Sequence, residues 1–226
     1  MSRWAMSIDL DRCTACGACD VACAQENNVH LGDPQRPDQI VRWMEILPVA
    51  TGKFPDAKAR LLPMPCQHCD DPACTKVCPT FATYLSPEGL VPQIYTQCIG
   101  CRYCVNACPY TCKHYTFSTP EFPEPLARGL NPDVSLRMSG VVEKCNFCYH
   151  RLLKARDAAA VDGKPFKSTD YQTACQQACP TKAIEFGDKE DETSAVATAG
   201  RDARSFRLLE ELGLEPKVTY LKETST

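Results

Sequence analysis

The sequence contains no long apolar run. No segment approaches the 18 or more consecutive apolar residues of a membrane-spanning helix. The first residues, MSRWAMSIDLDRC, also lack the charged and then apolar pattern of a secretory signal peptide. We therefore expect a chain that is soluble by itself and has no direct membrane span.

The sequence also has little net charge. Lysine and arginine number 25 and aspartate and glutamate 28, which gives a formal net charge of −3. Nucleic-acid surfaces and polybasic membrane patches both need an excess of basic residues, so we expect no nucleic acid among the partners. Apolar residues other than cysteine make up only about 36% of the chain, which is little for one large hydrophobic core.

Signatures of catalysis are missing as well. The chain shows no nucleophile–base pair and no glycine-rich phosphate loop. The haem attachment signature CxxCH is absent, because Tyr149 stands between Cys148 and His150. We therefore expect no catalytic residue in this chain and no enzymatic activity of its own.

Cysteine, in contrast, is abundant. Sixteen of the 17 cysteines fall into four quartets, of which three are compact runs and the fourth is split by a longer segment. The compact runs are Cys13, Cys16, Cys19 and Cys23; Cys66, Cys69, Cys74 and Cys78; and Cys98, Cys101, Cys104 and Cys108. The split quartet is Cys145, Cys148, Cys175 and Cys179.

The spacing of these runs indicates iron–sulfur chemistry. A C-x2-C-x2-C-x3-C run is typical of a cubane 4Fe–4S cluster, because three thiolates on one tight loop can each reach a different iron. In two-cluster ferredoxins the last cysteine of each run, often followed by proline, supplies the fourth ligand of the other cluster. Pro79, Pro109 and Pro180 follow three of the four terminal cysteines here, and Ala24 follows the fourth.

Two other uses of cysteine are weaker interpretations. A disulfide framework fits small secreted domains, whereas this chain has 226 residues and an odd number of cysteines. Structural zinc is held by paired CxxC motifs, so the split quartet taken alone also fits a zinc site. The three neighbouring cubane runs favour a cluster there too.

The chain is an internal repeat of two ferredoxin-like modules, one inserted in the other. The inner module covers 66–117, and the outer module joins 1–31 to 143–187. The outer ending CPTKAIEFGD repeats the inner segment CPTFATYLSP. Cross-ligation then predicts four metal-binding sets: Cys13, Cys16, Cys19 and Cys179; Cys23, Cys145, Cys148 and Cys175; Cys66, Cys69, Cys74 and Cys108; and Cys78, Cys98, Cys101 and Cys104.

Local patterns predict an α+β fold with short hairpins and loops. We expect strands at 4–10 and 41–47, and a strand–turn–strand within 79–97 that turns around 86–89. The apolar spacing in 150–161 predicts a helix.

The remaining segments connect or pack. We expect a connecting segment at 32–65, with a turn in DPQRPDQ, and a proline-rich linker at 118–142. The C-terminal arm, 188–226, is predicted to pack without chemistry. Its predicted helix starts at Asp202 and stops at Gly213, and a strand follows at 217–221.

Several segments carry a resemblance over nearly the whole chain. In order they are CTACGACDVACAQEN, CQHCDDPACTKVCPT, CIGCRYCVNACPY, and EKCNFCYHRL followed by ACPTKAIEFGD. The chain resembles the four-cluster, ferredoxin-like iron–sulfur electron-transfer subunits of the molybdopterin oxidoreductase superfamily, of the dimethyl sulfoxide and polysulfide reductase type. The segments LLEELGLEPKVTYL and NPDVSLRMSGVVEKC are most similar to subunits of periplasm-facing menaquinone reductases and of the alternative complex III group.

The resemblance implies a protein that relays single electrons through four 4Fe–4S clusters. The implied partners are a large molybdopterin-family subunit or a multihaem cytochrome, and a multi-span membrane subunit that binds quinone. The implied place is the periphery of a membrane-bound respiratory complex, on the periplasmic face, with the cytoplasmic face as the alternative.

Two features qualify this resemblance. Cys112 stands where the family usually has a small apolar residue, so it is either a buried spare thiol or a replacement ligand for Cys108. Some relatives lack one cysteine of the third run and hold a 3Fe–4S cluster. This chain keeps the full set, so we expect four 4Fe–4S clusters, one of which could lose an iron and be present as 3Fe–4S.

Residues beside the ligands are candidates for tuning the cluster potentials. Hydrogen bonds to sulfur, nearby charge and solvent exposure set these potentials. Lys144, Arg102 and His68 are the candidates, and the alternative is that they are ordinary solvated or packed residues. The alternative function is a redox sensor or a catalytic iron–sulfur protein. A cluster with only three cysteine ligands would indicate that function, and no cysteine is missing here.

Overall fold

The computed structural model describes residues 2–30, 32, 36 and 39–224, and its regular elements are short. Most of the predicted turn in DPQRPDQ lies outside the described residues. The helices are α1 (Ala18–Glu26), α2 (Ala73–Lys76), α3 (Tyr103–Ala107), α4 (Tyr149–Val161), α5 (Ala174–Ala178) and α6 (Ala195–Arg201). Single 3-10 turns are η2 (Tyr95–Gln97), η3 (Leu126–Gly129), η4 (Ser168–Asp170) and η5 (Glu210–Leu212).

The strands form one four-stranded sheet and two two-stranded sheets. They are β1 (Trp4–Asp9), β2 (Met44–Thr51), β3 (Lys58–Pro65), β4 (His114–Tyr115), β5 (Val142–Glu143), β6 (Ile184–Asp188), β7 (Ser205–Phe206) and β8 (Val218–Leu221). The larger sheet has the order β6-β1-β8-β7, β2 pairs with β3, and β4 pairs with β5.

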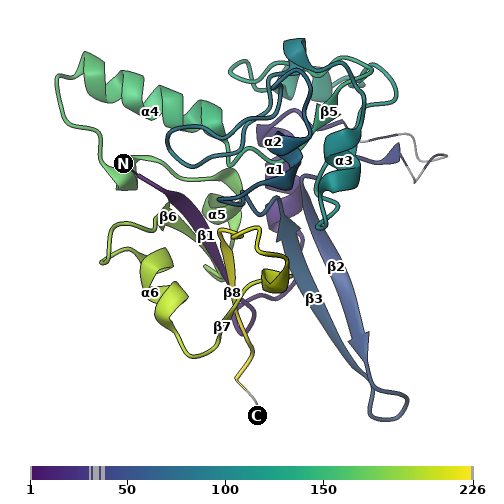
Figure 1. The fold of residues 1–226 in the computed structure, drawn as a ribbon, viewed down its shortest axis with the longest axis vertical. Coiled ribbons are helices and arrows are strands. Elements are labelled where there is room, and N and C mark those ends of the chain that lie inside the picture. The colour runs from purple at the N-terminus through teal and green to yellow at the C-terminus, as the bar shows by residue number, and fades with distance from the viewer. Residues whose placement is uncertain (1, 31, 33–35, 37–38, 225–226) are drawn as a thin grey trace.

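Strand β1 lies inside the larger sheet and confirms the strand predicted at 4–10 (Figure 1). It runs antiparallel to β6 and parallel to β8, so both of its edges are hydrogen-bonded. Trp4 stacks on Phe186 at 5.6 Å between ring centroids and meets Tyr171 edge to face at 4.7 Å. This aromatic cluster is the core of the sheet region, and β8 confirms the strand predicted at 217–221.

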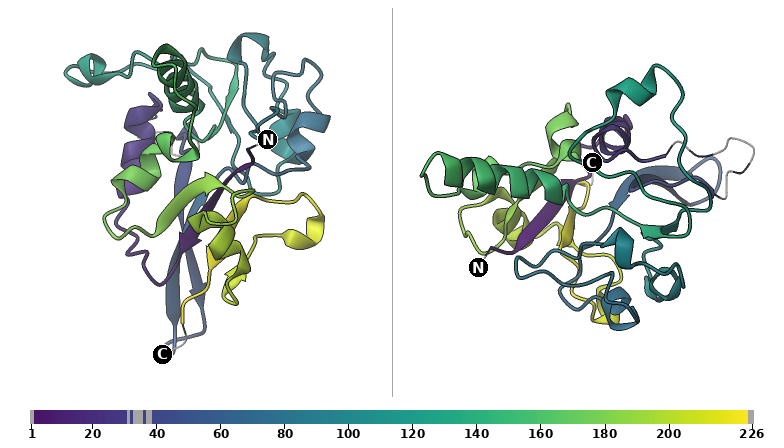
Figure 2. Two further views of the ribbon diagram at one scale, coloured as in Figure 1. Left: turned by 90° about the vertical axis from the view of Figure 1, so that its left-hand side faces the viewer. Right: turned by 90° about the horizontal axis from the view of Figure 1, so that it is seen from above.

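The β2–β3 hairpin projects from the rest of the molecule (Figures 1 and 2). Its register pairs Met44 with Pro65 at the base and Thr51 with Lys58 near the tip. The strand predicted at 41–47 therefore begins later and runs further. Val41 is buried ahead of the strand instead, because pairing with β3 sets the start of β2 and local alternation does not.

The segment 79–97 has the predicted turn without the predicted strands. The N–H of Gly89 donates to the Ser86 carbonyl at 2.9 Å, which closes the turn. Beyond the turn only Thr83 and Gln93 form an isolated bridge. Backbone hydrogen bonds from the Ile94 N–H to the Ala82 carbonyl at 2.7 Å and from the Tyr84 N–H to the Pro92 carbonyl at 3.5 Å flank this bridge. Pro92 has no N–H to donate, which keeps the pairing short.

The helix predicted from Asp202 to Gly213 is wrong. Helix α6 instead ends at Arg201, and its N-terminal cap is Ser194, whose side chain accepts the Ala197 N–H. Residues Ser205–Phe206 form β7 and pair with β8. Tertiary pairing outweighs the apolar spacing of this stretch, so part of the C-terminal arm belongs to the larger sheet.

Two pairs of helices hold the cysteine runs together. Helix α1 packs on α5, and α2 packs on α3. The helix predicted at 150–161 is confirmed as α4, and the predicted linker is mostly irregular apart from η3. No helix within the described residues is both long and apolar enough to cross a lipid bilayer.

Candidate metal centres

The structure brings sixteen cysteines together in four groups, each of which combines two cysteine runs. The groups are set A (Cys13, Cys16, Cys19, Cys179), set B (Cys23, Cys145, Cys148, Cys175), set C (Cys66, Cys69, Cys74, Cys108) and set D (Cys78, Cys98, Cys101, Cys104). The thiols of set A surround one cavity, and those of set C surround another. All 17 cysteines are free thiols.

The split quartet does not assemble as a unit. Cys179 lines the cavity of set A. The other three cysteines of the quartet lie close enough to Cys23 for their charges to raise its pKa; they are Cys145, Cys148 and Cys175. A zinc site made of the split quartet does not fit this arrangement, because its four thiols belong to two different groups.

Short helices distribute the thiols between neighbouring sets. On α1, Cys19 serves set A and Cys23 serves set B. Residues four apart in a helix lie on the same face about one turn from each other. One helix can therefore face two adjacent cavities, and Cys175 on α5 repeats the pattern with Cys179, the residue that follows α5. In the same way α2 and α3, with the cysteines that follow them, serve sets C and D.

The loops that carry the thiols share one backbone feature. The residue two positions after the first cysteine of each quartet has a positive φ: Ala15 (53°), His68 (43°), Gly100 (67°) and Phe147 (54°). A left-handed residue turns the chain sharply, so the following cysteine points back toward the same centre. At Gly100 this residue must be glycine, because an added Cβ would collide with the Gly140 carbonyl oxygen. At the other three positions a residue with a side chain adopts this unfavourable backbone conformation, and the packing around the loop holds it there.

Two terminal cysteines sit in matching polar corners. The hydroxyl of Thr80 lies 3.8 Å from the sulfur of Cys78, and that of Thr181 lies 3.7 Å from the sulfur of Cys179. Burial raises the pKa of both thiols, whereas hydrogen bonds from backbone N–H groups and from these hydroxyls lower it. The lowering is the larger effect, so each pKa lies below the ordinary cysteine value. Donors around a sulfur favour the thiolate, which is the form that binds iron.

Set B is the most deeply buried group and has donors aimed at its sulfurs. Burial, with the neighbouring thiols, raises the pKa of Cys23 and of Cys145 well above the ordinary value. The Phe147 N–H donates to the sulfur of Cys145 at 3.4 Å. The side-chain amide of Asn27 lies 3.7 Å from the sulfur of Cys23 and 3.8 Å from that of Cys148. Such donors stabilise added negative charge on a cluster.

The four sets follow one another in the order A, B, C, D. Sets A and B share helix α1, which carries Cys19 and Cys23, and His68, the neighbour of Cys69 in set C, is hydrogen-bonded to the Cys145 carbonyl of set B at 3.1 Å. Sets C and D share the packed helices α2 and α3. Only the two end sets have an exposed cysteine, Cys16 in set A and Cys101 in set D.

Two of the candidate tuning residues, His68 and Lys144, are buried. His68 stacks on Phe147 at 3.8 Å between centroids, and its Nδ1 accepts the Val91 N–H at 3.0 Å. Its Nε2 therefore carries the proton and donates to the Cys145 carbonyl at 3.1 Å. Burial, together with the charge of Lys144, lowers the pKa of His68 well below its ordinary value, so the imidazole is neutral. Lys144 donates to the same carbonyl at 2.7 Å.

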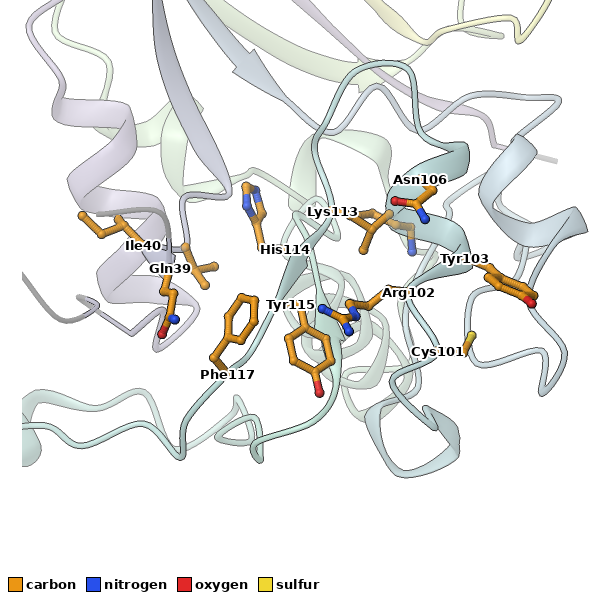
Figure 3. A pocket seen from close by; sticks show the side chains of 12 residues that line it. Gln39, Ile40, Cys101, Arg102, Tyr103, Asn106, Lys113, His114, Tyr115 and Phe117 are labelled. Carbon is orange, nitrogen blue, oxygen red and sulfur yellow. The ribbon is translucent and has the colours of Figure 1, made fainter. Parts of the chain in front are cut away.

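The third candidate, Arg102, lies at the surface. Its guanidinium is 4.8 Å from the centre of the Tyr115 ring, beside Cys101 of set D (Figure 3). Water screens an exposed charge, so Arg102 has less influence on a cluster than the buried lysine.

Cys112 lies between sets B and C and outside the cavity of set C. Its S–H donates to the carbonyls of Pro65 at 3.4 Å and Tyr110 at 3.2 Å. Burial raises its pKa well above the ordinary value, and the thiols of Cys66, Cys108 and Cys145 add to this. The cavity of set C is lined by Cys108 and not by Cys112. This position favours the buried spare thiol over the replacement ligand.

Sequence reasoning missed the residues that support set B from outside. Asn27 stands at the end of the first cysteine motif, and its position four residues after Cys23 places it on the same side of α1. Arg137, in the predicted linker, donates to the Asn27 carbonyl at 2.6 Å and to Glu143 at 2.9 Å. No local pattern marks Arg137, because its contact with Asn27, 110 residues away, exists only in the folded chain.

The donor sets fit 4Fe–4S clusters. Each set offers four thiols, and Ile46, Pro63 and Ile184 are among the residues that wall the cavity of set A. Among the described residues no three His, Cys, Asp or Glu side chains converge on one point as the ligands of a single ion do. In sets A and C the thiols surround a space instead, as the corners of a cube require.

Two family models match the chain. The 4Fe–4S dicluster domain matches residues 57–122, and the 4Fe–4S binding domain matches residues 4–25. The first match contains the second and third cysteine runs, and the second contains the first run. The chain thus has two ferredoxin-type iron–sulfur domains and mixed α and β structure.

The chain is also similar to proteins of known function along nearly its whole length. It is 44% identical to the iron–sulfur cluster-binding subunit of menaquinone reductase from Nitratidesulfovibrio vulgaris, over 97% of this chain and 88% of that protein. It is 36% identical to the Hdr-like menaquinol oxidoreductase iron–sulfur subunit 1 from Archaeoglobus fulgidus, over 97% and 83%. It is 33% identical to the arsenate respiratory reductase iron–sulfur subunit ArrB from a Shewanella species, over 97% and 96%.

These relatives agree with the expected resemblance. Both the relatives and the family models point to a carrier of several 4Fe–4S clusters and not to a catalytic subunit. The chain therefore belongs to the ferredoxin-like iron–sulfur electron-transfer subunits of the molybdopterin oxidoreductase superfamily.

Proposed function

We propose that this subunit passes single electrons through four 4Fe–4S clusters, one held by each of sets A to D. The carrying observation is the order of the sets: sets B and C, which have no exposed cysteine, lie in the middle, and each end set has an exposed cysteine. A cube held by four thiolates has no free iron for a substrate, so it supplies electron transfer only. The protein holds the cubes, excludes water from the middle two and directs donors at their sulfurs.

The ligand assignment is cross-ligation between cysteine runs. Each cluster takes three thiols from one quartet and the terminal thiol of its partner quartet, as in two-cluster ferredoxins. The shared helices support this, because Cys19 and Cys23 on α1 face sets A and B in one order, whereas Cys175 on α5 and Cys179 just after it face them in the opposite order. The matching corners of Cys78 with Thr80 and of Cys179 with Thr181 support it as well.

The modular organisation follows from the same pairing. The outer module would consist of 1–31 and 143–187, with the inner module, 66–117, inserted between its halves. The pairing of β1 with β6 and the packing of α1 on α5 support the outer module. The packing of α2 on α3 supports the inner one. The segments 32–65 and 118–142 connect them, and 188–226 adds β7 and β8 to the outer sheet.

The subunit would be docked at both ends. One partner is a large molybdopterin-family subunit or a multihaem cytochrome, and the other is a multi-span membrane subunit that reacts with quinone. The place would be peripheral, on the periplasmic face of a membrane-bound respiratory complex. The relatives' names, which include menaquinone reductase and arsenate respiratory reductase subunits, support partners of this kind.

Metal content in the native complex tests the proposal. Four cubes require about 16 iron and about 16 acid-labile sulfide per chain, with reducible EPR signals. The complex should also contain a multi-span membrane subunit and a large redox subunit. About 12 iron with bound zinc would contradict the fourth cluster. A free monomer that reduces a small molecule by itself would contradict the relay.

A further inference from the structure

Lys113 is a buried cation with uncharged hydrogen-bond partners. Only 3% of the residue is exposed. Its Nζ donates to the Thr83 hydroxyl at 2.8 Å and to the Gln93 side-chain oxygen at 3.1 Å. Among the described residues it forms no ion pair with a carboxylate. The two partners belong to the isolated bridge of the inner module, which thus fixes the position of the ammonium group.

Lys113 lies between the two thiol sets of the inner module. It lines the cavity of set C together with Cys74 and Cys108. It also lines the neighbouring groove, of about 540 Å³, that contains Cys101 of set D (Figure 3). Its positive charge favours the thiolate form of Cys104 in set D. It does the same for Cys74 and Cys108 in set C.

A buried ammonium group needs a counter-charge. An isolated cation in a protein interior is strongly disfavoured unless it is paired. Thr83 and Gln93 supply hydrogen bonds but no negative charge. A 4Fe–4S cube bound by four thiolates is an anion, and sets C and D would place one such anion on each side of Lys113.

Building on the proposed function, we propose that Lys113 is the shared counter-charge of the two inner clusters and raises the reduction potential of both. Each cluster gains one electron when its neighbour is oxidised, so its negative charge increases by one. A fixed positive charge stabilises the reduced form more than the oxidised form. The inner clusters are therefore easier to reduce than the same cubes would be without Lys113.

Two substitutions remove this charge by different routes. Lys113→Met deletes the ammonium group and keeps an unbranched side chain of similar length. Gln93→Glu keeps Lys113 and places a carboxylate beside Nζ, which neutralises it locally. Lys113→Arg preserves the charge. Lys76→Met is the matched control, because Lys76 carries the same charge on α2, between Cys74 and Cys78, but its side chain is 59% exposed and pairs with Asp71.

The measurement is a potentiometric EPR titration of the native complex, with iron content determined in parallel. The inner signals are assigned as those lost in Cys69→Ser and Cys104→Ser. We expect Lys113→Met and Gln93→Glu to retain wild-type iron and to lower the reduced-to-oxidised ratio of both inner clusters about tenfold at the wild-type midpoint. For a one-electron couple this is a shift of about 59 mV. Lys113→Arg should keep the potentials of both inner clusters close to the wild-type values, and Lys76→Met should leave them unchanged.

Unshifted inner potentials in Gln93→Glu with full iron content would overturn the inference, even if Lys113→Met fails to assemble its clusters. An equal shift in Lys76→Met would also overturn it, because burial would then not matter. If the wild-type complex lacks these iron–sulfur signals, the proposed function itself fails, and the inference fails with it.

Discussion

The guanidinium of Arg137 and the carboxylate of Glu143 form a fully buried ion pair, with Nε 2.9 Å from Oε2. The pair joins the predicted linker to the chain just ahead of Cys145. Trp43 donates its indole N–H to the same carboxylate at 3.1 Å, and Arg137 also holds the carbonyl of Asn27. Arg137 and Glu143 are only six residues apart, but Trp43 and Asn27 come from distant segments, so the network holds both sides of set B in position.

Removing one member of this pair should be costly. Arg137→Met leaves Glu143 buried without its cation, which we expect to lower the free energy of unfolding by about 3 to 5 kcal/mol. Iron should be lost first from set B, because Arg137 holds the carbonyl of Asn27. Anaerobic thermal unfolding and EPR of the native complex measure both effects.

The double variant provides the control for this prediction. Arg137→Met with Glu143→Gln removes both charges, so part of the lost stability should return. A single variant as stable as the wild type would show that the pair has no structural role.

Cross-ligation predicts which cluster is damaged by a change on α1. Cys23→Ala should cost set B its cluster and leave set A intact, because Cys23 faces Cys145, Cys148 and Cys175. About a quarter of the iron should be lost. EPR combined with an iron assay distinguishes the two clusters. Loss of the signal from set A with set B intact would show that ligation is local to each run.

Cys112→Ser is the matched control for the cysteine variants. A serine hydroxyl can donate to the carbonyls of Pro65 and Tyr110 as the thiol does, so all four clusters should remain. Loss of the cluster in set C would instead identify Cys112 as a ligand in place of Cys108.

Asp70 should stabilise the fold in a pH-dependent way. Burial raises the pKa of this carboxyl, whereas hydrogen bonds from Lys189, Lys217 and Arg3 lower it. The hydrogen bonds outweigh burial, and the pKa falls to about 2. A folded-state pKa below the unfolded value contributes stability above about pH 4, and this is lost as pH falls toward 2. Asp70→Asn should therefore cost about 1 kcal/mol at pH 7, after allowance for solvent screening.

The pH profile separates this effect from simple loss of packing. The difference in Tm between wild type and Asp70→Asn should be constant from pH 8 to about pH 5 and shrink only in acid. Asp71→Asn is the control, because the Asp71 side chain is 52% exposed and pairs with Lys76 at the surface. A difference that shrinks already between pH 7 and pH 6 would contradict the assignment to Asp70.

Patterns that depend on neighbouring residues predict their elements correctly. The alternation in β1, the apolar spacing in α4 and the turn at Ser86 to Gly89 all appear in the structure. Local patterns fail where a strand from a distant part of the sequence pairs with the same segment. The stretch around Phe206 has helical spacing, yet it pairs with β8, because a strand partner and the Tyr220 ring at 5.6 Å are available only in the folded chain.

The candidate site divides in the same way. The residue types and spacing of the cysteines by themselves determined the chemistry, because a cube needs three thiols on one tight loop and a fourth from elsewhere. Only the tertiary structure decided which other groups lie near the thiol sets: the amide of Asn27, the buried pair of Arg137 and Glu143, and the ammonium group of Lys113. These groups come from segments far apart in the chain, and burial and counter-charge are properties of the packed molecule that no local pattern contains.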